Sequence, residues 1–97
     1  MSCCYLVAQV TVHDPAEYQK YVDGFDAALS PFDGKVVAVD AHPVILEGAW
    51  PYPRTVLIRF ASQAEAKRWY DSAEYQRICE HRWRSASVNL VLIEGRE

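Results

Sequence analysis

The sequence has no long hydrophobic run, no excess of basic residues and few cysteines. No apolar stretch approaches the roughly 18 residues that a membrane-spanning helix needs. No basic segment precedes the first apolar stretch, as a secretory signal would require. The formal net charge of -3 disfavours nucleic acids and anionic membranes, because both need a basic face on their partner. We therefore expect neither a nucleic-acid partner nor a membrane.

The cysteines give no disulfide or metal pattern. Cys3, Cys4 and Cys79 are odd in number, whereas a disulfide scaffold needs an even one. Cys3, Cys4 and His13 lack the usual spacing of metal ligands. The motifs of phosphate-binding loops, dinucleotide folds, zinc proteases and serine hydrolases are also missing. These features predict a reduced, cytoplasmic protein with no metal and no cofactor.

What the chain does have is apolar surface. Its 97 residues make one small domain, residues 1–97, and 51% of them are hydrophobic, near the upper end of the range for a soluble domain. A domain of this size buries only about 60–65% of the surface that its unfolded chain exposes. The apolar surface that remains favours association with another chain.

Hydrophobic periodicity divides the chain into strand, helix, strand, strand, helix, strand. Alternating β-branched residues mark the strands, and apolar residues three and four apart mark the helices. Strands are predicted over residues 4–12, 35–41, 54–61 and 88–94, with a short extended piece through 44–46.

Both helical regions begin with capping signals. Asp14 with Glu17, and Ser62 with Glu65, have the spacing of a capping box, in which cap and acidic residue satisfy each other's backbone N–H. Ser72 interrupts the second region and can cap its continuation. The buried stripes are expected to contain Tyr18, Tyr21, Val22, Phe25 and Leu29 in the first helix, and Tyr75, Ile78, Cys79, the stem of Arg82, Trp83 and Ala86 in the last.

This order is typical of the ferredoxin-like βαββαβ sandwich, an α+β fold in which an antiparallel four-stranded sheet carries two helices on one face. A solvated sheet face should be polar, but alternation places apolar side chains on the helix-free face as well. This apolar patch indicates an interface or a ligand surface. The simplest solution is a two-fold homodimer through the helix-free face, which would enclose Gln9 and Arg59. The patch is predicted to contain Tyr5, Val7, Val37, Val39, Leu57, Val91 and Ile93.

Several segments occur in an order that resembles a known family. They are Asp14-Pro15, the pair Tyr18 and Tyr21, Leu46-Glu47-Gly48-Ala49-Trp50, Arg54, Trp69-Tyr70-Asp71-Ser72-Ala73-Glu74-Tyr75 and Leu92-Ile93-Glu94-Gly95. Together they make residues 5–95 similar to the domain of unknown function 1330 family, in the dimeric α+β barrel superfamily. The resemblance implies a ferredoxin-like protomer and a homodimer whose sheets pack into a barrel.

The resemblance implies little about chemistry, since that family has no established activity. Relatives in the superfamily include cofactor-free monooxygenases acting on aromatic polyketides, lactone isomerases and haem-binding enzymes. Arg59 departs from the resemblance, which would place an apolar or acidic residue there, so the lining of the barrel is expected to differ in this chain.

Four aromatic residues are candidates for a ligand-binding site. Trp69, Tyr70 and Tyr75 could line a pocket between the sheet and the helices, although aromatic residues at helical spacing also commonly fill the core. Trp50 lies on a proline-rich loop with Tyr52, where it could partly close such a pocket or plug the end of the barrel.

Two histidines and two arginines are candidates for catalysis. His42 in a turn and His81 at a solvated helical position could act as general bases, because the histidine pKa lies near neutrality. Arg54 and Arg59 could bind a carboxylate or an enolate through the guanidinium fork, or form ion pairs with glutamates of neighbouring strands. Neither histidine has a nucleophile at motif spacing.

Three functions are consistent with the sequence. The leading hypothesis is a homodimer that binds a small apolar or aromatic organic molecule without a cofactor. The second is a cofactor-independent monooxygenase or isomerase, in which Arg54 or Arg59 stabilises an enolate-like anion and a histidine or tyrosine moves the proton. The third is a purely structural or interaction dimer with a filled core. The first two require a cavity of at least a few hundred Å³ near Trp69 and Tyr70, whereas a well-packed interior without one would support the third.

Overall fold

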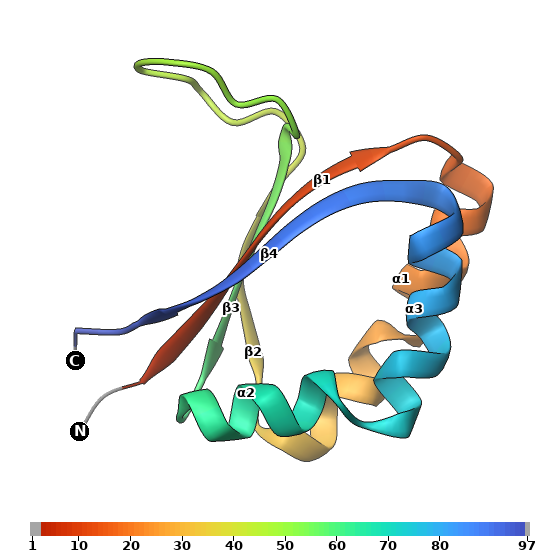
Figure 1. Ribbon diagram of the computed structural model, residues 1–97, viewed down its shortest axis with the longest axis vertical. Helices are drawn as coiled ribbons and strands as arrows, with labels where there is room; N and C mark the ends of the chain where they lie inside the picture. The colour runs from red at the N-terminus through yellow and green to blue at the C-terminus, as the bar shows by residue number, and fades with distance from the viewer. Residues whose placement is uncertain (1–2, 97) are drawn as a thin grey trace.

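A computed structural model describes residues 3–96, folded as a sheet with helices on one face (Figure 1). Its elements are β1 (Cys4–Val12), α1 (Pro15–Leu29), the short 3-10 helix η1 (Ser30–Phe32), β2 (Lys35–Asp40), β3 (Arg54–Phe60), α2 (Gln63–Tyr70), α3 (Ala73–Ser85) and β4 (Ala86–Glu94). Within residues 3–96 no helix is long and apolar enough to cross a membrane.

The four strands form one antiparallel sheet in the order β2-β3-β1-β4. Each helical connection therefore spans a strand that lies between the two that it joins, and the helices cover one face only (Figure 1). At the centre of the sheet, Val7 of β1 lies opposite Leu57 of β3 and Val91 of β4. The predicted ferredoxin-like α+β fold is confirmed.

The helices begin at the residues that the capping signals predicted. Asp14 Oδ1 accepts a hydrogen bond from the N–H of Glu17, and Ser62 Oγ accepts one from the N–H of Glu65. The break between α2 and α3 is capped by Ser72, whose Oγ accepts a bond from a backbone N–H of the first turn of α3. The second bond of each capping box, from the backbone N–H of the cap residue to the glutamate carboxylate, was predicted wrongly. The Glu17 carboxylate contacts α3 instead, and that of Glu65 pairs with Arg68 on its own helix.

The core lies between the sheet and the helices. Trp69, Tyr75 and Phe60 are at most 1% exposed and pack ring against ring at its centre. Two residues expected in the buried stripes are exposed, namely Val22 and Trp83. Successive residues of a helix point about 100° apart. On α3 the side chain of Arg82 is the buried one, and the side chain of the adjacent Trp83 is therefore turned away from the core toward solvent.

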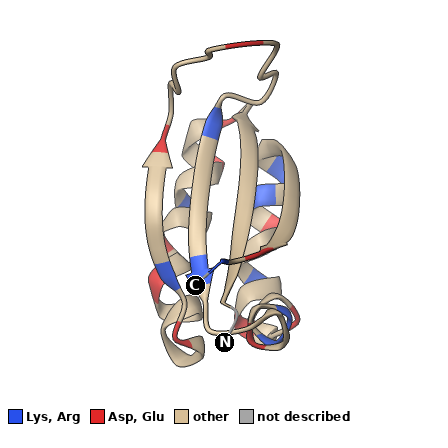
Figure 2. Cartoon of the chain, turned by 90° about the vertical axis from the view of Figure 1, so that its left-hand side faces the viewer, with Lys and Arg blue, Asp and Glu red and all other residues tan. Residues whose placement is uncertain are grey.

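No helix covers the other face of the sheet (Figure 2), and Val7, Leu57 and Val91 lie on it, as the alternation predicted. Val91 and Ile93 of β4 are about half exposed, and the charged residues of the strands lie near their ends (Figure 2). One assignment was wrong. A bulge between Val36 and Ala38 shifts the register of β2, so that Val39 lies opposite Val56 and turns to the helix side.

The connection between β2 and β3 projects beyond the sheet (Figures 1 and 2). Its apolar residues Val44 and Leu46 are 85% and 90% exposed. The extended piece predicted over 44–46 joins no strand, because Pro43 lacks the N–H that a ladder needs and Gly48 turns the chain at a φ of 77°.

Candidate functional site

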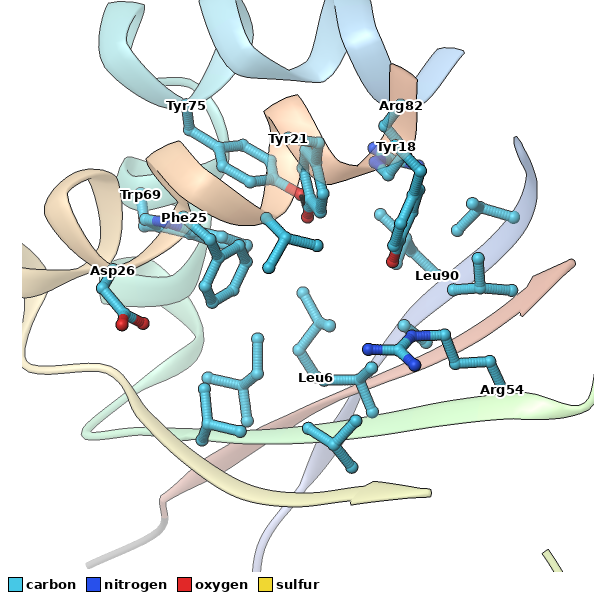
Figure 3. Close-up of a pocket in the computed structure, with 18 residues that line it drawn as sticks. Leu6, Tyr18, Tyr21, Phe25, Asp26, Arg54, Trp69, Tyr75, Arg82 and Leu90 are labelled. Carbon is cyan, nitrogen blue, oxygen red and sulfur yellow. Dashed lines mark hydrogen bonds between the residues drawn. The ribbon is translucent and has the colours of Figure 1, made fainter. Parts of the chain in front are cut away.

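A cavity of about 280 Å³ lies between the sheet and the helices (Figure 3). Its floor is aliphatic and comes from the side chains of the sheet that point toward the helices. It is lined on that side by Leu6, Ala8, Val56, Ile58, Val88 and Leu90. This volume is close to the lower end of the range for sites that hold small organic ligands.

The wall opposite the floor is aromatic and rigid. Trp69 and Tyr75 have ring centroids 3.9 Å apart, and Phe25 packs edge-on against Trp69 at 6.0 Å. Tyr18 and Tyr21, one turn apart on α1, continue this wall with centroids 5.5 Å apart. Packed rings hold one another in place, so the shape of this wall is set before any ligand arrives.

Two phenol hydroxyls meet at this wall, one from α1 and one from α3. The oxygens of Tyr21 and Tyr75 lie 2.8 Å apart and form a hydrogen bond (Figure 3). Burial raises the pKa of both phenols above the ordinary value of 10. Both are therefore protonated at neutral pH. One hydroxyl donates to the other, and the second keeps a proton that it can donate elsewhere.

Arg82 of α3 is a buried cation in the same wall. It is 5% exposed, and its guanidinium carbon lies 5.6 Å from the ring centroid of Tyr21. Nη2 donates a weak bond of 3.6 Å to the thiol of Cys79, while Nε is buried without a hydrogen-bond partner among the described residues. A buried charge with so few partners is costly in a protein of this size.

Arg54, the first residue of β3, brings a second guanidinium into the cavity (Figure 3). Its carbon lies 5.8 Å from the ring centroid of Tyr18. Its Nε is also buried without a partner within residues 3–96. The two arginines thus stand against adjacent tyrosine rings of one helix.

A separate polar cluster joins α1 to α3 outside the cavity. Glu17 Oε2 lies 2.6 Å from His81 Nδ1 and 2.9 Å from Arg84 Nη2. Hydrogen bonds from His81 and then from Arg84 lower the pKa of the Glu17 carboxyl from 4.5 to about 2. His81 is therefore engaged in a contact between helices, and is not the freely solvated residue that was expected.

We expect this cluster to make stability depend on pH in acid. The pKa of Glu17 is lower in the folded chain than in the unfolded one, so its contribution is present above pH 4.5 and is lost as the pH falls toward about 2. The urea midpoint of the wild type should exceed that of Glu17→Gln at neutral pH, and the gap should close across this window. Glu80→Gln, at an exposed position facing Arg84 at 4.0 Å, is the control and should change little. A gap that stays constant down to pH 2 would contradict this assignment.

The chain matches the sequence profile of the family described as domain of unknown function (DUF1330), over residues 3–96. The chain belongs to the DUF1330 family. The predicted resemblance is thereby confirmed. Among curated proteins no relative matches the chain.

Solved structures share the fold of this DUF1330 chain at low sequence identity. A protein of unknown function from Rhodopseudomonas palustris superposes with a TM-score of 0.83 at 14% identity, over 99% of this chain and 84% of that one. SnoaB, a cofactor-independent oxygenase from Streptomyces nogalater, has a TM-score of 0.63 at 14% identity, over 99% and 94% of the two chains. A dimeric protein of unknown function with a ferredoxin-like fold from Bacteroides fragilis has a TM-score of 0.61 at 10% identity, over 96% and 95%.

Two of the four predicted ligand-binding residues line the cavity of this DUF1330 chain. Trp69 and Tyr75 belong to its aromatic wall. Tyr70, at the end of α2, lies outside the cavity and is 36% exposed. Trp50 is 39% exposed on the projecting loop, where its Nε1 donates to Thr55 Oγ1 at 2.9 Å. Within one protomer the site therefore includes Trp69 and Tyr75 but neither of the other two.

One of the four catalytic candidates lines the cavity, namely Arg54. His42 is exposed on the projecting loop, and its backbone N–H donates to Asp40 Oδ1. His81 belongs to the Glu17 cluster, and Arg59 lies opposite Tyr5 on the helix-free side of the sheet. No histidine or cysteine lines the cavity within residues 3–96. No three His, Cys, Asp or Glu side chains of that range group as metal ligands would.

Sequence reasoning missed the part that Arg82 plays in the site. The residue was predicted on the buried stripe by its stem only, and was not among the candidate site residues. Tyr18 and Tyr21 were treated as core residues. One signal in the sequence could have found all three. A cation and two phenols occur on helical stripes whose other members are apolar, and a polar group that is buried there needs a partner.

Proposed function

We propose that this DUF1330 protein is a homodimer that binds a small, largely apolar or aromatic organic molecule in the sheet–helix cavity of each protomer, without a cofactor. The observation that carries the proposal is the cavity itself, about 280 Å³ with an aliphatic floor and an aromatic wall. Apolar walls in contact with water are unfavourable by about 25 cal/mol per Å². An apolar ligand would displace that water, and the packed rings would not have to move to admit it.

The homodimer is supported by the helix-free face. Val7, Leu57 and Val91 lie side by side across its centre, with no segment of residues 3–96 covering them (Figure 2). Two such faces related by a two-fold axis can bury each other completely. The similar protein from Bacteroides fragilis is described as dimeric. We infer the same arrangement here, with the two sheets packed face to face.

A second candidate function is a cofactor-independent oxygenase or isomerase. It is favoured by the two guanidinium groups in the cavity, which could stabilise an enolate, and SnoaB shows that a cofactor-independent oxygenase can have this fold. The lining favours binding over catalysis, however. Tyr21 and Tyr75 are held protonated, and among the described residues the lining has no histidine and one carboxylate, that of Asp26.

Filling the cavity tests the binding proposal. Ala8 belongs to the floor and is 6% exposed. The probe is naphthamide, a neutral aromatic amide. Ala8→Leu should occupy part of the cavity and weaken the binding of this probe by about tenfold or more, as measured by isothermal titration. Ala27→Leu, at an exposed position of α1, is the matched control and should bind as the wild type does. Equal binding by both variants would show that the ligand lies elsewhere.

A further inference from the structure

Several polar groups that line the cavity can donate hydrogen bonds. They are the guanidinium groups of Arg54 and Arg82, the indole Nε1 of Trp69, and the hydroxyl pair of Tyr21 and Tyr75. The indole nitrogen and both arginine Nε atoms are buried without a partner within residues 3–96. Buried donors are rarely left unpaired in proteins. A ligand that completes this site must therefore supply acceptors.

The site also carries the positive charge of two guanidinium groups. No carboxylate of residues 3–96 forms an ion pair with Arg54 or Arg82. Asp26 lines the cavity, but Figure 3 places it at the opposite side from both guanidinium groups. It stands just over two turns beyond Tyr18 on α1, about 12 Å along the helix axis. The arginine end of the cavity is thus an uncompensated cationic site with apolar walls.

We propose that the ligand is an organic anion, whose carboxylate binds at the side of the cavity that carries Arg54 and Arg82 and whose apolar or aromatic body fills the cavity toward Trp69. This inference rests on the proposed binding function and names the chemical class of the ligand. A carboxylate has two oxygens and about four acceptor positions, which match the fork of a guanidinium. The free phenol proton of the tyrosine pair supplies one further donor.

The arrangement explains why two cations are retained in an apolar cavity. An unpaired buried charge destabilises the empty protein, whereas an incoming carboxylate pairs with it in a medium of low dielectric constant. The ligand gives up its hydration for several charge-assisted bonds at once. A neutral apolar molecule would fit the same walls and leave both arginines unpaired. The site therefore discriminates by charge as well as by shape.

Paired ligands test the inference. Naphthoate and its neutral amide, naphthamide, share one ring system and differ in charge. Isothermal titration at neutral pH should give a dissociation constant about 10- to 100-fold lower for naphthoate. Arg54→Gln and Arg82→Gln should each remove most of this advantage while leaving the binding of naphthamide within about twofold. Arg54→Lys keeps the charge and should keep part of the advantage.

The outcomes separate the inference from the proposed function. Arg68→Gln, on the outer surface of α2 where the side chain pairs with Glu65, is the control and should behave as the wild type. If naphthoate and naphthamide bind the wild type equally, or if both arginine variants keep the preference, the anion site is refuted while the binding cavity stands. If neither compound binds to the folded wild type, the proposed function itself fails.

A stability measurement gives an independent readout. Because Arg82 is an unpaired buried charge, Arg82→Met should leave the urea midpoint of the ligand-free protein unchanged or raise it. The same variant should lose the preference for naphthoate. If Arg82 served the fold alone, its replacement would lower the midpoint, and the assignment to ligand binding would be wrong.

Discussion

Replacing Val7 by lysine is expected to split the proposed homodimer into monomers. Val7 lies between Leu57 and Val91 at the centre of the helix-free face, and two-fold symmetry would bring the new charge into the interface twice. An unpaired charge buried in an apolar contact costs about 3 kcal/mol or more. The dimer dissociation constant should therefore rise by more than about a thousandfold. Sedimentation at micromolar concentration would show a mass of 11.1 kDa in place of twice that value.

Ala27→Lys is the matched control for this substitution. Ala27 is exposed on α1, on the other side of the molecule from the helix-free face. This variant should sediment as the wild type does, because its lysine remains in water in both the monomer and the dimer. A Val7→Lys variant that remains dimeric at the same concentration would show that the chains do not associate through this face.

Replacing Trp69 by alanine is expected to give the largest loss of stability within the protomer. Trp69 is 1% exposed and contacts the rings of Phe25, Phe60 and Tyr75. Removal of a buried tryptophan leaves a cavity that its neighbours cannot fill, at a cost of about 4 kcal/mol. For a chain of this size the melting temperature should fall by about 20 °C, measured by circular dichroism at a fixed protein concentration.

Trp83→Ala provides the comparison with the same chemical change at an exposed site. Trp83 lies on α3 and is 54% exposed, so little packing is lost and the change should stay below about 1 kcal/mol. If the two variants melted at similar temperatures, the packing assigned to the aromatic wall would be wrong.

The sequence was sufficient for the fold because its signals are local. A cap such as Asp14 or Ser72 acts on N–H groups within its own first turn. The alternation of β1 fixes which side chains face the helices without reference to any other strand. The break at Ser72, which separates α2 from α3, could be predicted for the same reason.

The cavity depends on contacts that no local pattern encodes. Tyr21 and Tyr75 are separated by 54 positions, and nothing in either helix indicates that their hydroxyls meet. The bulge in β2 that turns Val39 toward the helices has no glycine to mark it. Trp69 and Tyr75 were predicted as site residues from their clustering. Arg82 was not, because its surroundings come from the folding of α3 onto α1.

The most direct test of a ligand-binding dimer is native mass spectrometry of the protein purified from its own host. We predict a species of two chains of 11.1 kDa each that carries a small acidic organic molecule in each protomer and releases it on collisional activation. The Ala8→Leu variant, prepared in the same way, should remain a dimer and carry less of that molecule. A monomer, or a dimer that carries nothing and also binds neither naphthoate nor naphthamide when they are added, would contradict the account.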